Sequence, residues 1–178
     1  MKIEEIQNAM AEKLEDSDCV LVGIGAEWKI GTEERERSVK EAVEHLQKIL
    51  TGRDYFVIST LGQEDFARLG FESSHTVTPL DVSLTEEEWD RYTLWLSRTL
   101  NRKLVLVELG EGFAHPSLIR WPFERTAWIN QKAYLFRIHK TLYQITDELT
   151  GKAVGIHADS VEFLADWNKH TEEEHGSN

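Results

Sequence analysis

Nearly continuous apolar runs alternate with helical patterns along this chain. Three such runs stand at Cys19–Ile24, Tyr55–Ser59 and Leu104–Leu109. Runs of this length and composition are typical of parallel strands that are covered on both faces. Two further apolar runs, Tyr134–Ile138 and Ala153–Ala158, predict additional strands. The strand pattern therefore predicts a mainly parallel sheet.

Helical spacing of apolar residues fills most of the intervals between these runs. It predicts helices at residues 3–15, from Thr32 to Leu50, at 64–69, at 85–100, at 123–131 and at 160–167. Thr85 and Glu88 have the spacing of a capping box, which marks a helix start. Residues 72–82 show no strong period and predict a loop with one short strand. A strand followed by a helix, repeated about five times, predicts a Rossmann-like, doubly wound α/β fold in three layers.

Length and composition predict one globular domain over residues 1–167, followed by a polar, disordered tail at 168–178. The chain has 32 acidic and 20 basic residues and a formal charge of -12. This surface disfavours nucleic acid and anionic membranes, because both need clustered basic residues. Cys19 is the one cysteine, which excludes an internal disulfide and a cysteine zinc cluster. With no signal core and no membrane-length apolar run, these features predict a soluble, cytoplasmic protein.

Glycines lie at the ends of three predicted strands or just after them. They are Gly23, Gly25, Gly62, Gly110 and Gly112. Parallel strands end at one edge of a sheet, and ligands of open α/β sheets bind just beyond that edge. We expect these turns to expose backbone N–H groups that would suit a phosphate. Tight turns without any ligand are the alternative interpretation, and two glycines alone do not decide between the two.

Several ungapped segments resemble one family. They are VLVGIGAEW, YFVISTLGQEDFARLGF, LVLVELGEGFAHPSLIRWPFE, AYLFRIH and AVGIHADSVEFL. Across Cys19–Leu164 the chain resembles the sirtuin-like, NAD-binding superfamily, whose fold is also that of deoxyhypusine synthase. It is most similar to short bacterial sirtuin-like proteins that occur beside macrodomain and ADP-ribosylation genes. The resemblance implies a site for NAD or ADP-ribose.

The same resemblance implies which residues line that site. The cofactor-binding positions that it implies are Gly23, Gly25, Ala26, Glu27, Ser59, Thr60, Gly110, Glu111, Gly112, Phe113, His139, Ala158, Asp159 and Ser160. It implies no zinc, because the small zinc module of the family is absent.

The chain departs from the family at the catalytic positions. Leu61 and Gln63 stand where catalytic sirtuins carry an Asn and an Asp that hold the nicotinamide ribose and ring. The general-base histidine has only His75 as a match, and Glu27 replaces a serine near the expected phosphates. A carboxylate there is unfavourable unless it is paired or protonated. The resemblance therefore implies a degenerate protein without deacylase activity.

Other polar residues permit alternative interpretations. His115, His139 and His157 could together bind a metal, but ordinary hydrogen bonding is the simpler expectation for them. Glu108 and Glu111 have a spacing compatible with acid–base chemistry. Glu108 lies within an apolar strand, where pairing with Arg120 or Arg125 is the structural alternative.

Three functions stay open on the sequence. The first is a nucleotide-sensing or protein-binding module. The second is an NAD-cleaving hydrolase or ADP-ribosyltransferase that uses Glu111, His75 or Glu64. The third is an assembly subunit without a ligand. Six tryptophans, and the aromatic helix face from Trp89 to Leu100, predict core packing or self-association.

Overall fold

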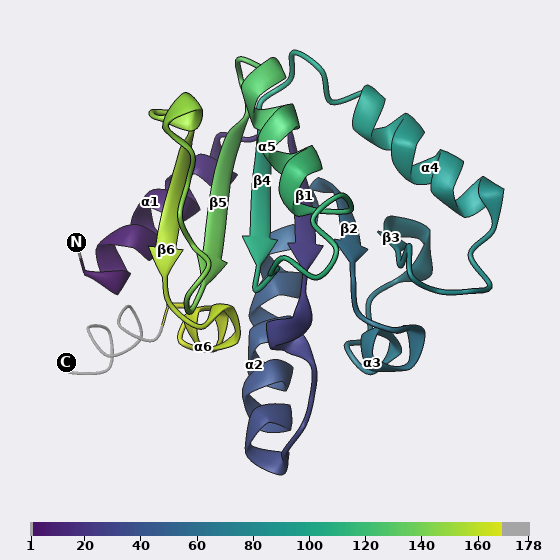
Figure 1. The fold of residues 1–178 in the computed structure, drawn as a ribbon. Coiled ribbons are helices and arrows are strands. Elements are labelled where there is room, and N and C mark those ends of the chain that lie inside the picture. The colour runs from purple at the N-terminus through teal and green to yellow at the C-terminus, as the bar shows by residue number, and fades with distance from the viewer. Residues whose placement is uncertain (1, 169–178) are drawn as a thin grey trace.

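The computed structural model describes residues 2–168 and contains one sheet in which every neighbouring pair of strands is parallel. The six strands are β1 (Cys19–Ile24), β2 (Asp54–Ser59), β3 (Thr76–Val77), β4 (Leu104–Leu109), β5 (Tyr134–His139) and β6 (Ala153–His157). Their order in the sheet is β3-β2-β1-β4-β5-β6, as Figure 1 shows. The predicted Rossmann-like fold class is confirmed.

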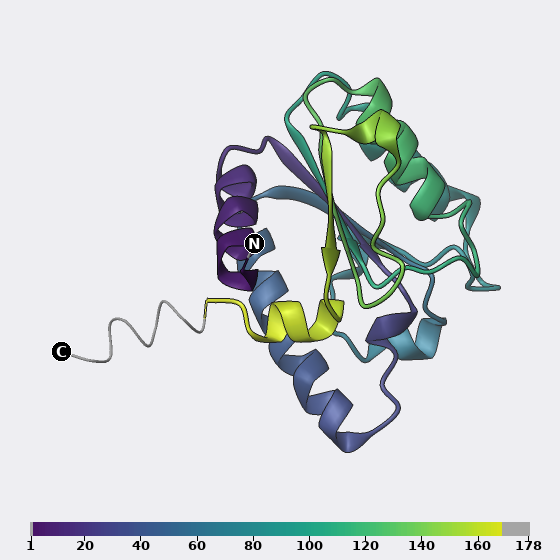
Figure 2. The same ribbon diagram turned by 60° about the vertical axis from the view of Figure 1, so that its left-hand side comes forward.

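Helices cover both faces of the sheet. They are α1 (Ile3–Glu15), α2 (Glu33–Leu50), α3 (Gln63–Ala67), α4 (Glu86–Ser97), α5 (Arg120–Ile129) and α6 (Ser160–Ala165). Short 3-10 turns lie at Ala26–Trp28, Ser73–His75 and Asp147–Leu149. Figure 2 shows α1, α2 and α6 on one side of the sheet and α5 on the other, which gives the three layers expected from the sequence.

Alternate residues of each strand enter two separate cores. Along β1, Val20, Val22 and Ile24 pack with α1, α2 and α6, whereas Cys19 and Leu21 pack with α4 and α5. Burial raises the pKa of the Cys19 thiol to about 11, so the thiol stays protonated and unreactive at neutral pH. A strand with apolar residues on both faces needs such a double cover, which explains the continuous apolar runs.

Element boundaries follow the sequence patterns closely, with one clear difference. The capping box of α4 is present, because Glu88 N–H donates to Thr85 Oγ1 and Thr85 N–H donates to Glu88 Oε2. Helix α5 begins at Arg120, three residues before the predicted start. The prediction missed this start because proline is unfavourable inside a helix, and Pro122 lies just before Phe123. Proline is tolerated in the first helical turn, where N–H groups lack helical partners anyway. The aromatic side chains of α4 mainly face the sheet, with Tyr92 only 3 % exposed.

Two expectations concern the ends and the surroundings of the chain. The predicted tail, apart from Asn168, lies outside the described residues. Within residues 2–168, none of the helices combines the length and the apolar character that crossing a membrane would require.

The sheet topology places the reversal of strand order between β1 and β4. From β1 the chain moves to β2 and β3 on one side, then crosses to β4, β5 and β6 on the other. Such a reversal in strand order is the usual ligand-binding position of doubly wound folds. The carboxyl edge, defined here by the strand ends Ile24, Ser59, Leu109 and His139, is therefore where the candidate site must be sought.

Candidate functional site at the carboxyl edge

The glycine turns after β1 and β4 pack against each other and leave little room for a ligand. Gly25 N–H donates to the Leu109 carbonyl (2.9 Å), and Gly110 N–H donates to the Ile138 carbonyl (2.8 Å). A Cβ atom at Gly25 would lie 2.5 Å from Glu111 Cα. Both N–H groups donate to carbonyl groups at the ends of neighbouring strands, so the expectation that they are free for a phosphate is wrong.

Glycine at position 110 is required by its neighbours and by its backbone. Its φ of +69° lies in the left-handed region that favours glycine. A Cβ atom there would also overlap the Glu27 side chain and lie 2.7 Å from Ser160 Oγ. The turn after β4 is therefore shaped around Glu27.

The Glu27 carboxylate is bound by the protein's own hydrogen-bond donors at this edge. Its Oε1 accepts from the backbone N–H of Ser160 (3.0 Å) and from Ser160 Oγ (2.6 Å), and its Oε2 accepts from the backbone N–H of Lys140 (3.0 Å). Trp28 Nε1 in turn donates to Ser160 Oγ (3.0 Å). The Glu27 side chain is only 5 % exposed. These three donors form an anion-binding group, and the anion they hold is Glu27.

His139 lies beside Glu27 but does not form an ion pair with it. Its Nδ1 lies 3.7 Å from Glu27 Oε2. The same Nδ1 accepts from the backbone N–H groups of Thr141 (3.0 Å) and Leu142 (2.8 Å), so it carries a lone pair and no proton. Burial is the main cause that lowers the pKa of His139. The imidazole is therefore neutral near pH 7 and fixes the start of the segment after β5.

Arg35 of α2 binds next to the donors that hold Glu27. Arg35 donates to the Asp159 carboxylate at 3.1 Å and to the backbone carbonyl of Glu27. Asp159 also caps α6 by accepting from the N–H groups of Val161 and Glu162. Sequence reasoning found Asp159 but missed Arg35, because the run EERER has the composition of a solvated helix face.

Glu111 is a buried carboxyl group in the turn after β4, where the strand order reverses. It is 3 % exposed, and its Oε2 accepts from Thr60 Oγ1 at 2.6 Å. Burial raises the pKa of Glu111 to about 7, and the Thr60 hydrogen bond opposes this shift. Near neutral pH the group therefore exists in both protonation states, which is the property that acid–base chemistry requires.

Four charged side chains, three of them buried, form one group next to the turn after β4. Arg137 Nε lies 3.0 Å from both oxygens of Glu108, and Arg137 Nη1 lies 2.8 Å from Glu124 Oε1. Arg120 Nη1 lies 3.5 Å from Glu108 and donates to the Glu111 carbonyl. Burial raises the pKa of Glu108, and Arg137 opposes this shift.

The sequence named only part of this charge group. Arg120 is one partner of Glu108, as expected, but Arg137 is the closer one. The alternative partner Arg125 is exposed and is not an ion-pair partner of Glu108 among the described residues. A single arginine inside the apolar strand YLFRIH was the available signal, because a buried arginine requires a carboxylate close by. Arg137 Nη2 is buried and has no hydrogen-bond partner among residues 2–168.

Several predicted site residues have local structural roles. Gly23 allows Ile119 and Phe123 of α5 to pack closely on β1. Ser59 Oγ donates to the Ile24 carbonyl (2.8 Å). Phe113 is 56 % exposed, and the Arg120 guanidinium lies 4.2 Å from its ring centroid.

Three of the remaining predicted positions also make local contacts or lie on the surface. The Cβ that Gly112 lacks would contact Leu142 at 3.6 Å. Ala26 is exposed, and Ala158 N–H donates to the Ile156 carbonyl (3.0 Å).

The histidine candidates are not brought together. His75 stacks on Tyr55, and its Nδ1 lies 3.1 Å from the Tyr55 carbonyl, in the first half of β2 and away from the carboxyl edge. His157 stacks on Tyr143. Within residues 2–168, His, Cys, Asp and Glu side chains form no group of three or more that could hold a metal. His115, His139 and His157 therefore do not make the ligand set considered from the sequence.

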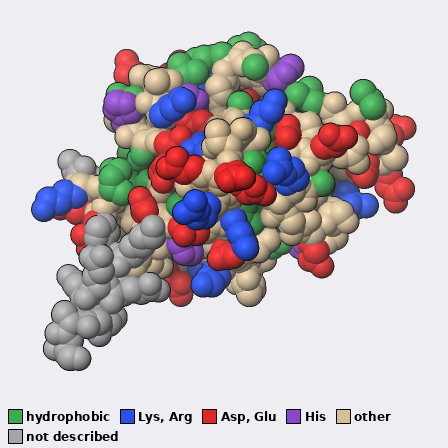
Figure 3. Space-filling view, turned by 90° about the horizontal axis from the view of Figure 1, so that it is seen from below, with side chains coloured by type: hydrophobic (Ala, Val, Ile, Leu, Met, Phe, Trp, Pro, Cys, Tyr) green, Lys and Arg blue, Asp and Glu red, His purple; other side chains and the backbone are tan. Residues whose placement is uncertain are grey.

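Viewed onto the carboxyl edge, the surface carries charges of both signs. Figure 3 shows acidic and basic side chains interleaved over the centre of this face. No protein-family model and no curated protein matches the chain. The resemblance to sirtuin-like proteins therefore rests on the segments of this chain alone.

Proposed function

We propose that this chain is an adenine-nucleotide-binding module of the sirtuin-like type, with NAD or ADP-ribose as its ligand class. The observation that carries the proposal is the donor group around Glu27. Two backbone N–H groups and one hydroxyl, from Lys140 and Ser160, already hold an anionic oxygen pair at the carboxyl edge. Phosphate oxygens accept hydrogen bonds of the same kind.

In this proposal Glu27 competes with the ligand. A pyrophosphate reaches the donors of Lys140 and Ser160 only after the Glu27 carboxylate has left them. The apparent affinity is then the intrinsic affinity multiplied by the fraction of molecules in which the donors are free. Replacing Glu27 with serine, the family's residue, removes the competitor and tightens binding.

The residue at one of the positions expected to hold the nicotinamide ribose and ring supports nucleotide binding without deacylation. Leu61 is 4 % exposed and belongs to the core, so it offers no hydrogen bond to a ribose. An unpaired polar group on a ligand costs about 1–3 kcal/mol. Adenine nucleotides should therefore bind at least as well as NAD, and nicotinamide alone should not bind.

Thermal melting tests this proposal. We would compare ADP-ribose, AMP, NAD and nicotinamide at millimolar concentration on the wild type, on Glu27→Ser and on Glu148→Ser, an exposed acid removed as a charge-matched control. A ligand at about 100 times its Kd stabilises by roughly 2.7 kcal/mol, which raises Tm by roughly 5–10 °C. The shift should be larger for Glu27→Ser than for the control.

Two other functions compete with this one, and each rests on a specific observation. Glu111, with its pKa near 7, favours an NAD-cleaving hydrolase or transferase, and release of nicotinamide from NAD would reveal that activity. The mutual packing of Gly25 and Gly110 favours an assembly subunit without a ligand. Absence of a melting shift with every adenine nucleotide, in wild type and in Glu27→Ser, would leave that function standing. We also propose that the protein is cytoplasmic.

A further inference from the structure

Exposed apolar side chains gather around helices α4 and α5. Among the described residues, nine large apolar side chains are exposed, and five of them belong to this region: Leu94, Leu100, Trp121, Trp128 and Ile129. Trp128 is 62 % exposed and Trp121 is 56 % exposed. Apolar residues that cluster in this way on a protein surface mark interaction sites.

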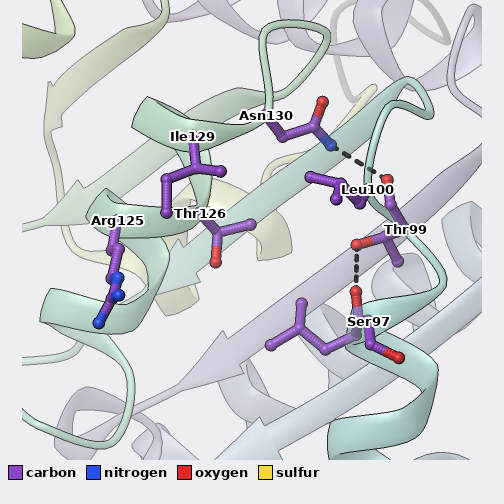
Figure 4. A pocket seen from close by; sticks show the side chains of 8 residues that line it. Ser97, Thr99, Leu100, Arg125, Thr126, Ile129 and Asn130 are labelled. Atoms are coloured by element: carbon purple, nitrogen blue, oxygen red, sulfur yellow. Dashed lines mark hydrogen bonds between the residues drawn. The ribbon is translucent and has the colours of Figure 1, made fainter.

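A groove of about 280 Å³ runs between the two helices. Figure 4 shows Thr126 and Ile129 of α5 on one side and Leu100, which follows α4, on the other. Asn130 Nδ2 donates to the Thr99 carbonyl (3.1 Å) and ties the ends of the two helices together. Small-molecule pockets usually measure about 300–1,000 Å³, so this shallow groove suits protein side chains better.

The outward face of α4 has charges that complement a second copy of itself. Glu87 and Asp90 are exposed in its first half, and Arg98 is exposed at its C-terminal end. None of these three side chains forms an ion pair within residues 2–168. An antiparallel copy of α4 would bring the acids of each helix beside the arginine of the other. Two-fold symmetry then makes each of these contacts twice.

We propose that the α4–α5 face is a homodimer interface, in which α4 lies antiparallel to α4 of a second copy. Leu94 lies near the two-fold axis, and Leu100, Trp128 and Ile129 are buried at its flanks. Tryptophan and arginine are the residues that contribute most at such interfaces. This interface is not the aromatic face of α4 considered from the sequence, because Trp89, Tyr92 and Trp95 pack toward the sheet. It is independent of any nucleotide at the carboxyl edge.

Sedimentation equilibrium on the full chain tests the interface. The wild type should have twice the chain mass at about 100 µM, since standard-size interfaces reach micromolar affinity or better. Leu94→Ser and Trp128→Ser should weaken dimerisation at least about tenfold, which corresponds to 1.4 kcal/mol. Val82→Ser, which removes a fully exposed apolar side chain outside this face, is the matched control and should dimerise like the wild type.

Charge reversal provides the sharper test. Arg98→Glu alone and Asp90→Arg alone should each be monomeric, because like charges then meet across the axis. An equimolar mixture of the two variants should regain dimers, since each acid again faces a base. A monomeric wild type at about 100 µM would overturn the proposal. So would a dimer that all four variants leave intact, or a mixture that stays monomeric.

Discussion

Replacing Glu111 with glutamine should change how the stability of this protein depends on pH. The folded-state pKa of Glu111 is about 7, against an ordinary value of 4.5. Below pH 4.5 both the folded and the unfolded chain hold this proton. As pH rises from 4.5 to 7, the unfolded chain releases this proton first, so the free energy of unfolding falls. Above pH 7 the stability that the protonated carboxyl group provided at low pH is lost.

The size of the effect follows from the same two values. Their difference corresponds to at most about 3 kcal/mol, and partial solvation of the carboxylate reduces it to about 2 kcal/mol. Glutamine stays neutral at every pH and keeps an acceptor for Thr60 Oγ1. The variant should therefore match the wild type within about 1 kcal/mol at low pH and exceed it by about 2 kcal/mol at high pH.

Urea unfolding at several values between about pH 5 and about pH 8 measures this difference directly. Glu148→Gln, which changes an exposed acid, is measured beside it as the control for the loss of one carboxyl group. A Glu111→Gln difference that does not vary with pH would refute the reasoning, because it would mean that Glu111 titrates normally in the folded protein.

Three further predictions follow from the site and its support. Gly110→Ala should lose at least about 2 kcal/mol of stability in the same urea assay, because the alanine would need a positive φ and its Cβ would overlap Glu27. Gly62→Ala, where a Cβ has open space, should change stability by less than about 1 kcal/mol. Arg137→Met should lose about 3–5 kcal/mol of stability, because the buried Glu108 loses the closer of its two arginine partners, and adding Glu108→Leu should recover part of that loss. Acetyl-lysine peptides with NAD should release no acetyl product, and measurable NAD-dependent release would contradict the proposal of a degenerate site.

The fold could be predicted from the sequence because both signals that define it are local. Strands buried on both faces need continuous apolar runs, and β1 and β4 were located to the residue. Helices α1 and α2 followed from apolar spacing. The structure adds that Thr32 caps α2, because its side chain accepts from Arg35 N–H. The short strand expected within residues 72–82 is β3, whose two residues the weak local pattern could not place. The start of α5 was missed because Pro122 stands in its first turn.

The candidate site was predicted only in part, because its interactions join residues far apart in the sequence. Glu27 was noticed as an unfavourable carboxylate, but two of its three donors, at Lys140 and Ser160, are backbone N–H groups, which carry no residue identity. Arg35 was hidden in a charged helix. The pairing of Glu108 with Arg137 became evident only when β4 and β5 were seen as neighbours.

Amide NMR of Lys140 and Ser160 during titration with ADP-ribose tests the central claim most directly. These two N–H groups now donate to Glu27, and we predict that they are the donors a pyrophosphate takes over. Both amide resonances should move with a saturable dependence on ADP-ribose, at lower concentration in Glu27→Ser than in the wild type, and nicotinamide should leave them unchanged. Resonances of Lys140 and Ser160 that stay fixed up to millimolar ADP-ribose in both proteins would contradict the account.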